Sequence, residues 1–525
     1  MRFFNTEGPN RQENHYTLPP LSRWDLGEIL ALIDQKKYFL LHAPRQTGKT
    51  TCLLALAEHL NREGRCRAVY ANLEVAQAYR AQLDKGMTAV VEQVSRGARD
   101  QLGDAGAADL GREIILSSSG GTAVGEFLAR WSAQSLQPLV LLLDEVDALI
   151  GDTLLSLLRQ LRAGYPQRPT AFPQTIILCG VRDLRDYRIH ASSEREAITG
   201  GSAFNIKAKS LRLGDFSAAE TRTLLLEHTR ETGQVFTPEA LAAQVWELTR
   251  GQPWLVNALA YRACFELHEG RDRRQPITLA LIDQAKEAMI VERVTHLDQL
   301  AHKLQEPRVR RVIEPILAGT ALGEVPTDDR DYLVDLGLLR RDGAGGLVVA
   351  NPIYREVLPR MLASGPQDSL PQISPTWLNA DGSLNPQSLL TAFLAFWRRH
   401  GQPLLGSVAY HEIAPHLVLM AFLHRVVNGG GTLEREYAIG MGRMDLCLRY
   451  GAVTLGLELK VWRDREADPL VDGLEQLDGY LAGLGLDTGW LVIFDRRSNQ
   501  PPIAERTACQ TATSPQGRAI AVIRA

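Results

Sequence analysis

Short apolar runs alternate with longer segments of helical periodicity over the first 180 residues. The apolar runs lie at 38–42, 67–71, 138–143 and 175–179. Residues 26–36 and the segment from Gly48 to about Leu60 have helical spacing instead. Buried strands that alternate with helices are typical of a parallel sheet covered by helices on both faces. The pattern therefore predicts an α/β core over 1–215, in which a short strand leads directly into a helix.

The pattern becomes helical throughout 216–290. The segment FSAAETRTLLLEHTR starts this region, and Ser217 stands where a helix N-cap is expected. We expect a helical lid over 216–290. Residues 291–364 then combine helical segments with the sequence GLLRRDGAGGLVVANP, in which Asp342-Gly343 is typical of a hairpin turn. This order predicts a winged-helix-like segment.

The composition and the periodicity of the chain change again near residue 365. Residues 365–386 are rich in Pro, Ser, Asp, Asn and Gly and have little periodicity, which predicts a linker. In 387–525, the strand-like segments RMDLCLRY and GLELKVW precede the helical GLEQLDGYLAGLG and the apolar GWLVIFD. This order predicts a mixed α/β domain that contains a βαβ-like unit. A chain of 525 residues also exceeds what one hydrophobic core usually organises.

The first candidate site directly follows the first predicted strand and has the sequence LLHAPRQTGKTT. A glycine-containing turn between a strand and a helix directs backbone N–H groups at phosphates. Gly48 would allow the close approach, Lys49 would reach the outer phosphates, and Thr50 would place its hydroxyl on a magnesium ion. Further contacts are expected from Arg45, Gln46, Thr47 and Thr51. The segment departs from GxxxxGK[ST] because Ala43 replaces the first glycine.

A second part of this site is expected at the end of the apolar run in PLVLLLDEVDAL. Asp144 would hold the magnesium ion, directly or through water, and Glu145 would orient the water that attacks the γ-phosphate. The structural alternative is a strand that ends in a solvated acidic turn. Because the acidic pair follows a phosphate-binding segment, we favour the functional interpretation.

The second candidate site lies in the C-terminal region. Glu458 and Lys460 are two residues apart on a predicted strand and therefore project from the same face. Pairing with the preceding strand would bring Asp445 next to Glu458 as a second magnesium ligand. Lys460 would stabilise charge or position a water molecule, and Gln476 lies on the following helix. The alternative is a surface hairpin that carries charges without catalytic meaning.

Three segments of the N-terminal region resemble the AAA+-related ATPases of the archaeal-ATPase and STAND groups. They are PRQTGKTT, LLLDEVDAL and GQPWLVNALA, and the resemblance covers about Leu18 to Arg360. It implies that Gly251 and Pro253 of the lid contact the nucleotide. It also implies that a polar residue after the strand at 175–179 senses the γ-phosphate, for which Arg182 is the candidate. The sequence does not choose a finger residue among Arg159, Arg162 and Arg185.

The C-terminal region resembles the PD-(D/E)xK nuclease superfamily, whose core is restriction-endonuclease-like. Asp445, Glu458 and Lys460 match its signature, and Gln476 matches the glutamine that many members carry on the next helix. Met444 replaces the nominal proline of the signature. The superfamily also has an acidic residue on its first helix, for which Glu412 is our candidate. The resemblance implies magnesium-dependent cleavage of phosphodiesters.

The composition of the chain limits the classes of protein to which it can belong. Hydrophobic residues at 45% and charged residues at 23% are near the averages of soluble globular proteins, which excludes a disordered or fibrous chain. The net charge of −3 means that contact with DNA must come from local patches. The six cysteines have no zinc-ligand spacing, and no apolar run approaches the ~20 residues that span a bilayer. We therefore expect reduced thiols, no membrane partner and a cytoplasmic location.

Together these features predict an ATP-binding and ATP-hydrolysing protein with ATP and Mg²⁺ as cofactors. Its nucleotide state would gate a magnesium-dependent nuclease-like domain that acts on DNA, and assembly into a homo-oligomer is compatible with this interpretation. The alternative is a signalling or scaffolding NTPase whose inactive tail binds nucleic acid or a partner. A DNA translocase is a third hypothesis, which would require ATP turnover stimulated by DNA. No sequence feature favours it.

Overall fold

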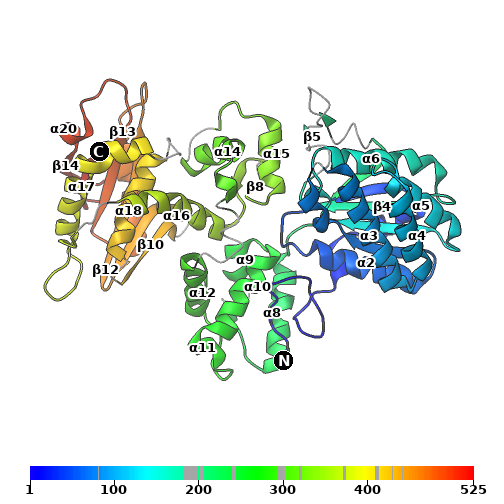
Figure 1. Cartoon of the computed structure of the whole chain (residues 1–525). Helices are drawn as coiled ribbons and strands as arrows, with labels where there is room; N and C mark the ends of the chain where they lie inside the picture. Colours follow the sequence, from blue (N-terminus) through cyan, green and yellow to red (C-terminus); the bar gives the residue numbers. More distant parts are fainter. Residues whose placement is uncertain are drawn as a thin grey trace. The chain divides into compact units, whose positions relative to one another are not determined.

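The computed structural model of the chain forms two compact units (Figure 1). The first unit comprises Met1–Glu292 and Pro326–Pro352, and the second comprises Arg293–Val325 and Ile353–Ala525. The structure describes residues 1–80, 82–182, 188–189, 198–199, 205–238, 244–292, 300, 302–318, 322–343, 345–370, 374–407, 413–427, 430–439 and 442–525.

A five-stranded sheet in the order β2-β3-β4-β1-β7 is the centre of the first unit. Its strands are β1 (Tyr38–His42), β2 (Arg67–Asn72), β3 (Leu139–Asp144), β4 (Thr175–Gly180) and β7 (Lys207–Arg212), and all neighbours are parallel. The predicted parallel α/β core is confirmed, and the four predicted strands agree with β1 to β4 within one residue at each end. The edge strand β7 has the polar sequence KAKSLR, so no apolar run could predict it. A short separate ladder joins β5 (Arg188–Ile189) and β6 (Ile198–Thr199).

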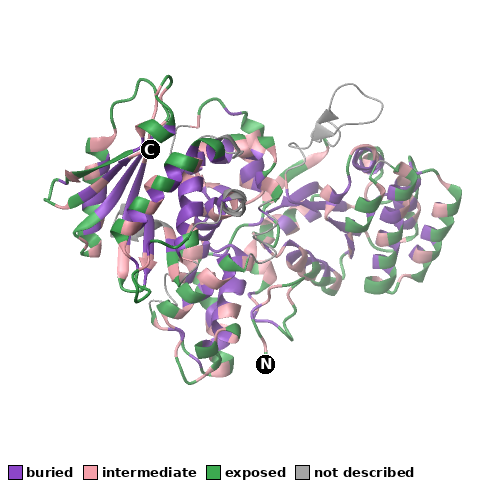
Figure 2. Ribbon diagram, turned by 60° about the vertical axis from the view of Figure 1, so that its left-hand side comes forward, coloured by how far each residue is buried: buried purple, intermediate pink, exposed green. Residues whose placement is uncertain are grey.

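Helices cover both faces of this sheet and create two apolar cores. Met87, Phe127 and Trp131 belong to the core on one face, and Ile29 and Leu53 belong to the core on the other. The first core packs under α3 (Leu83–Leu102), α4 (Ala105–Ser117), α5 (Ala123–Gln134) and α6 (Asp152–Gly164), and the second under α1 (Leu26–Asp34) and α2 (Lys49–Glu63). Short 3-10 helices lie at Pro20–Arg23 (η1), Glu74–Tyr79 (η2), Val146–Ala148 (η3) and Tyr165–Gln167 (η4). Figure 2 shows the buried residues concentrated between these layers.

The lid is mostly helical in its described residues, and an isolated parallel β-bridge joins Phe236 to Ile277. It contains α8 (Ala218–Thr232), α9 (Val245–Thr249), α10 (Pro253–Tyr261), the π-helix η7 (Arg262–Glu266), α11 (His268–Arg271) and α12 (Leu279–Val291). Ser217 caps α8 as predicted, because its Oγ accepts a hydrogen bond from the Glu220 N–H at 3.1 Å. The Glu220 carboxylate in turn accepts one from the Ser217 N–H at 2.8 Å, which completes a capping box.

The first sixteen residues, which we call the N-terminal strap, pack on the lid. Phe4 and Tyr16 are fully buried, and the Tyr16 hydroxyl lies 3.1 Å from Nδ1 of His228 in α8. Arg2 forms an ion pair with Glu231, also in α8, at 2.8 Å. The expected boundary of the α/β core at residue 1 therefore does not follow the packing, because the aromatic side chains of the strap complete the apolar interior of the lid.

The predicted winged-helix-like segment is divided between the two units. Helix α15 (Thr327–Asp335) and the hairpin β8 (Leu339–Arg341)–β9 (Leu347–Val349) belong to the first unit. The reason is local packing against the sheet: Asp335 lies 3.6 Å from His42 at the end of β1. By contrast, α14 (Pro307–Ala318) and almost all of α16 (Pro352–Ser369) belong to the second unit.

A six-stranded mixed sheet in the order β10-β11-β12-β13-β15-β14 is the centre of the second unit. Its strands are β10 (Gly431–Ile439), β11 (Gly442–Tyr450), β12 (Val453–Trp462), β13 (Thr488–Asp495), β14 (Ala508–Thr513) and β15 (Ala519–Arg524). Strands β10, β11 and β12 form an antiparallel meander, whereas β12, β13 and β15 are parallel. The helices are α17 (Pro386–Ser407), α18 (Ala414–Val427), α19 (Leu470–Leu484) and the short α20 (Ile503–Arg506). Helix α19 connects β12 to β13, as the βαβ-like prediction required.

The segment predicted as a linker, 365–386, is partly ordered into the second unit. Helix α16 continues to Ser369, and the Trp377 side chain is buried with its ring 5.8 Å from that of Phe422 in α18. Leu384 is buried as well. The few apolar residues of this polar stretch show no periodicity, so its packing could not be predicted from the sequence. No described helix in the chain is both long and apolar enough to cross a membrane.

Candidate functional site

The loop between β1 and α2 is held in shape by its own side chains. Gly48 adopts a left-handed conformation with φ of 88° and forms the N-cap of α2, and Gln46 also has a positive φ. The Lys49 ammonium is buried and donates hydrogen bonds to the carbonyl oxygens of Ala43 at 3.0 Å and Pro44 at 2.9 Å. Ala43 itself does not have a positive φ, so the alanine methyl causes no strain at the position of the missing glycine.

The acidic pair at the end of β3 lies next to this loop. Asp144 is fully buried, and its Oδ2 accepts hydrogen bonds from the Thr50 hydroxyl at 2.7 Å and the Tyr70 hydroxyl at 3.1 Å. The structure therefore brings Thr50 and Asp144 together, as the sequence predicted for two magnesium ligands. A hydroxyl next to a carboxylate is an oxygen donor set that suits Mg²⁺. Tyr70, in β2, was not predicted, because a single tyrosine in a strand carries no motif.

Glu145 follows Asp144 in a strained conformation. Its φ is 55°, and its backbone N–H donates to Oδ1 of Asp144 at 2.9 Å. Burial raises the pKa of Glu145, whereas the positive charges of Lys49 and Arg45 oppose that shift. Arg45 is exposed at the outer side of the loop. Glu145 is thus close enough to Lys49 to interact with its charge, and its predicted role in orienting a water molecule stays a prediction.

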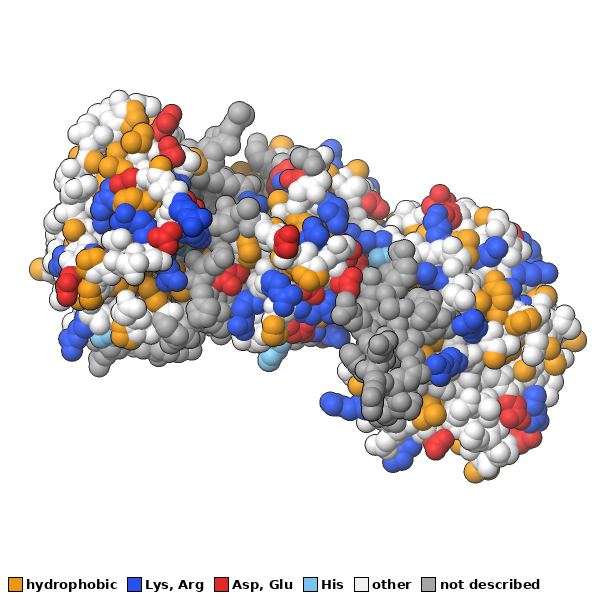
Figure 3. Space-filling view, turned by 90° about the horizontal axis from the view of Figure 1, so that it is seen from above, with side chains coloured by type: hydrophobic (Ala, Val, Ile, Leu, Met, Phe, Trp, Pro, Cys, Tyr) orange, Lys and Arg blue, Asp and Glu red, His pale blue; other side chains and the backbone are white. Residues whose placement is uncertain are grey.

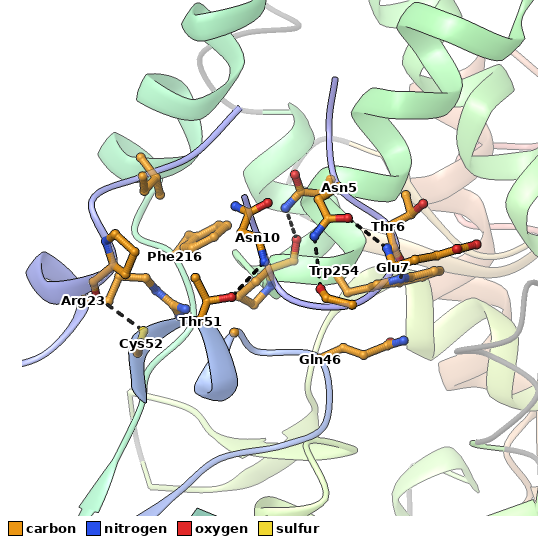
Figure 4. A pocket seen from close by; sticks show the side chains of 16 residues that line it. Asn5, Thr6, Glu7, Asn10, Arg23, Gln46, Thr51, Cys52, Phe216 and Trp254 are labelled. Carbon is orange, nitrogen blue, oxygen red and sulfur yellow. Dashed lines mark hydrogen bonds between the residues drawn. The ribbon is translucent and has the colours of Figure 1, made fainter. Parts of the chain in front are cut away.

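A pocket lies next to the loop between β1 and α2 (residues 43–48), which we call the P-loop, and several separate parts of the first unit line it (Figure 4). The P-loop and α2 contribute Gln46, Gly48, Thr51 and Cys52, and the strap contributes Asn5, Thr6, Glu7, Gly8 and Asn10. The connection from β7 to α8 (residues 213–217), which we call the hinge, contributes Phe216, and the lid contributes Pro253, Trp254 and Asn257. The remaining lining residues are Leu18, Pro20 and Arg23. Gln46, Gly48, Thr51 and Pro253 were predicted, and the strap residues were not, because a short polar segment far from any motif gives no signal.

Two hydrogen bonds fix the strap across this pocket. The Asn10 N–H donates to Oγ1 of Thr51 at 3.0 Å, and the Trp254 indole N–H donates to the carbonyl oxygen of Thr6 at 2.9 Å. The strap therefore bridges the helix that follows the P-loop and helix α10 of the lid.

Gly251 has a packing role that its predicted nucleotide contact did not reveal. It adopts φ of +78°, and a Cβ added there would overlap the backbone carbonyl of Phe216. The Phe216 N–H donates to the carbonyl oxygen of Gly251 at 2.8 Å. Close backbone approach of this kind requires glycine. Pro253, two residues later, is the first residue of α10 and lines the pocket.

The candidate sensor Arg182 lies two residues after the end of β4, the strand between β1 and β3. Its guanidinium lies 5.1 Å from the ring centre of Tyr332 in α15. Arg159 and Arg162 are on α6, whereas Arg185 lies outside the described residues. The sensor role of Arg182 stays a prediction.

In the second unit, the predicted nuclease residues converge. The antiparallel register pairs Leu446 with Leu457, so the next pair along it is Asp445 and Glu458. The Leu459 N–H donates to Oδ2 of Asp445 at 2.8 Å. The Lys460 ammonium donates to Oε1 of Glu458 at 2.7 Å.

The Lys460 ammonium also donates to Oε1 of Gln476 at 2.5 Å. Gln476 lies on α19, the helix that covers this face of the sheet. The structure therefore places Asp445, Glu458, Lys460 and Gln476 in one connected cluster at the edge of the apolar core under α19.

The electrostatics of this cluster fit a divalent cation. Glu458 is 3% exposed, and burial together with the neighbouring Asp445 charge raises its pKa to about 7. Its Oε2 is buried and accepts no hydrogen bond from any described residue. Two carboxylates, one with an unshared buried oxygen, are hard oxygen donors of the kind that Mg²⁺ prefers.

A third acidic ligand is not defined by the described part of the chain. No group of three or more His, Cys, Asp or Glu side chains arranged to hold a metal ion occurs among the described residues. The candidate Glu412 lies outside them. Asp445 and Glu458 are thus the two carboxylates that the structure brings together.

We compared the chain with known protein families, curated proteins and solved structures. Residues 33–187 match the family of AAA domains, and no curated protein matches the chain. A Walker-type ATPase of Pyrococcus abyssi is similar at 16% identity and a TM-score of 0.47, over 68% of this chain and 99% of that chain. The ORC2 protein of Aeropyrum pernix is similar at 15% identity and a TM-score of 0.38, over 65% and 94%. The RuvB Holliday junction branch migration motor of Thermotoga maritima is similar at 15% identity and a TM-score of 0.33, over 63% and 92%. The residues that match the family of AAA domains, 33–187, carry β1, the P-loop and Asp144.

Proposed function

We propose that the chain hydrolyses ATP at the P-loop and that its nucleotide state controls a metal-dependent nuclease centre in the second unit, with DNA as substrate. The observation that carries the nuclease half is the convergence of Asp445, Glu458, Lys460 and Gln476 in one cluster. The ATPase half is supported by the AAA-domain match and by the contact between Thr50 and Asp144.

In the ATPase half, each residue has a distinct task. Lys49 would exchange its two carbonyl partners for oxygens of the outer phosphates. Thr50 and Asp144 would hold Mg²⁺, which supplies charge neutralisation between the phosphates. Glu145 would orient the attacking water, since its carboxylate is close to Lys49 and follows Asp144 directly.

In the nuclease half, Asp445 and Glu458 would hold the cation, which supplies Lewis acidity at the scissile phosphate. Lys460 would stabilise the developing negative charge or position the attacking water. Gln476 would orient Lys460, because its side-chain oxygen accepts a hydrogen bond from that ammonium. Lys and Arg side chains are interspersed with Asp and Glu on the face shown in Figure 3, in line with the small net charge, so DNA contacts would be local.

The test is cleavage of plasmid and linear DNA with Mg²⁺ or Mn²⁺, with and without ATP. Wild type is compared with Lys49→Ala and Glu458→Gln, each first shown to fold by circular dichroism. Glu475→Gln is the matched control, because Glu475 is an exposed carboxylate on α19 next to Gln476. Loss of cleavage in Glu458→Gln but not in Glu475→Gln, with an ATP effect that requires Lys49, supports the proposal.

Three results would overturn separate parts of it. Cleavage that is equal in wild type and Glu458→Gln would remove the assigned nuclease centre. Lys49-dependent ATP turnover without cleavage of any substrate would move the second unit to a binding role, as in a signalling or scaffolding NTPase. ATP turnover that is the same in wild type and Lys49→Ala would remove the ATPase half.

A further inference from the structure

Arg23 is the last residue of η1 and contacts both the P-loop and the lid hinge. Its Nη1 donates to the carbonyl oxygen of Thr47 in the P-loop. Its Nη2 donates to the carbonyl oxygen of Gly214 at 2.5 Å. Its guanidinium also lies 4.7 Å from the ring centre of Phe216, and Figure 4 shows the two side chains next to each other at the pocket.

The bond to Thr47 fixes the orientation of a peptide group in the P-loop. In a trans peptide, the carbonyl and the following N–H point in opposite directions. A guanidinium on the Thr47 carbonyl therefore sets the direction of the Gly48 N–H, one of the free donors at the start of α2. Gly48 also makes room for this contact, since a Cβ there would lie 2.9 Å from Nη1 of Arg23.

The bond to Gly214 holds the connection between the sheet and the lid. This connection runs from the end of β7 at Arg212 to the start of α8 at Ala218. Its first part is anchored to the core, because the Leu213 N–H donates to the carbonyl oxygen of His42 at 3.0 Å. Its last part is anchored to the lid by the bond between Phe216 and Gly251. Gly214 lies between these anchors, where a change of lid angle must be absorbed.

We infer that Arg23 is a positioning residue that couples occupancy of the P-loop to the angle of the lid. Phosphate binding constrains the peptide groups of the P-loop, and Arg23 transmits that constraint to the Gly214 carbonyl and the Phe216 ring. The planar guanidinium suits this task because its donors form a rigid fork that bonds two carbonyls at once. The inference rests on the proposed ATP site and assigns a control element to it.

The experiment compares wild type with Arg23→Gln, Arg23→Lys and Arg62→Gln in the full-length chain. Arg62 is the matched control, because it is an exposed arginine on α2 that pairs with Glu58 on the same helix. A fluorescent ATP analogue gives the dissociation constant, and steady-state assays give kcat and KM. Hydrogen exchange of the 213–218 backbone, with and without the nucleotide, gives the response of the hinge.

We expect Arg23→Gln to weaken nucleotide binding by about tenfold, whereas kcat at saturating ATP changes by less than about threefold. The hinge should lose the protection that nucleotide adds in wild type. Arg23→Lys, which keeps the charge and one donor, should restore part of both effects. A merely structural role would lower hinge protection equally with and without nucleotide.

The inference is overturned if Arg23→Gln binds nucleotide like Arg62→Gln and keeps nucleotide-dependent protection of the hinge. If Arg23→Gln does not fold, Arg23→Lys decides by the same two measurements. A different result would show that the proposed ATP site itself is wrong: wild type and Lys49→Ala would then bind the fluorescent ATP analogue equally.

Discussion

The two candidate sites differ in how the protein satisfies their charged groups. In the first unit, Lys49 donates to two loop carbonyls and Asp144 accepts hydrogen bonds from Thr50 and Tyr70. In the second unit, Glu458 has one hydrogen-bonded oxygen and one buried oxygen without a described partner. The P-loop is thus stabilised by its own hydrogen bonds, whereas the carboxylate pair carries an electrostatic cost that a cation would relieve.

Because of this difference, a bound ligand should affect the stability of the two sites differently. Where the protein's own hydrogen bonds satisfy the polar groups of a site, a ligand binds by replacing some of those hydrogen bonds with its own. The fold of such a site does not depend on the ligand. A buried carboxylate pair raises the free energy of the folded state until a cation or a proton neutralises it. Substitutions should therefore reduce function at the first site and change stability at the second.

The largest expected effect concerns the P-loop lysine. Lys49→Ala should lower ATP turnover about a thousandfold, roughly 4 kcal/mol, because the charge that faces the outer phosphates is lost. The thermal stability of the first unit should change far less. Steady-state ATP turnover and calorimetry measure the two quantities, with Lys85→Ala, an exposed lysine on α3, as the control. A loss of folding equal to the loss of turnover would contradict the view that the loop is stabilised by several hydrogen bonds.

The next effect concerns the contact between the lid and its hinge. Gly251→Ala should destabilise the lid by about 3 kcal/mol, because its methyl group would overlap the Phe216 carbonyl. Gly233→Ala is the matched control: Gly233 has nearly the same φ, +76°, but open space around it, so only the backbone strain of about 1 kcal/mol remains. Hydrogen exchange of α8 and α10 compares the two variants. If the two variants were destabilised equally, the positive φ alone would explain why glycine is needed at residue 251.

A third effect tests the electrostatics of the second site. The pKa of Glu458 is raised from its ordinary 4.5 to about 7 in the folded protein. The stabilisation from its proton is therefore fully present below about pH 4.5 and is lost as the pH rises through about 7. In EDTA, the free energy of unfolding of the second unit should fall by on the order of 2 kcal/mol between these limits.

Added Mg²⁺ at about pH 8 should restore much of this stability, because binding to the folded state stabilises it. Glu458→Gln should lack both the fall and the Mg²⁺ effect, and calorimetry at several pH values measures them. A wild type whose stability is independent of pH and of Mg²⁺ would remove the contrast between the two sites.

The smallest effect concerns a residue that supports Asp144. Tyr70→Phe removes the hydrogen bond from the Tyr70 hydroxyl to Asp144, so we expect ATP turnover to fall about fivefold, roughly 1 kcal/mol. Tyr79→Phe in η2 serves as the control. Titration of Mg²⁺ in the ATPase assay should show the loss as a weaker apparent affinity for the cation. A change in kcat alone would place Tyr70 outside cation binding.

Four of the five strands of the first sheet, β1 to β4, could be predicted because each is a short, mostly apolar run that ends at a loop or a polar residue. Strands β1 and β3 are buried along their whole length, so their sequences contain no polar interruption. Strand β7 is an exposed edge, and its KAKSLR sequence looks like a loop. The segment containing Trp377 was predicted as a linker, because its burial depends on α18, which is distant in sequence.

The sequence by itself determined the chemistry at both candidate sites: the P-loop, the acidic pair, and the spacing of Glu458 and Lys460. Local rules govern these features, since a turn between strand and helix and an alternation along a strand need only neighbouring residues. Only the tertiary structure showed that the N-terminal strap lines the pocket next to the P-loop, that Tyr70 donates a hydrogen bond to Asp144, and that Arg23 joins the P-loop to the hinge. Each of these contacts joins residues far apart in the chain, and such contacts arise from packing, for which a single sequence carries no periodic signal.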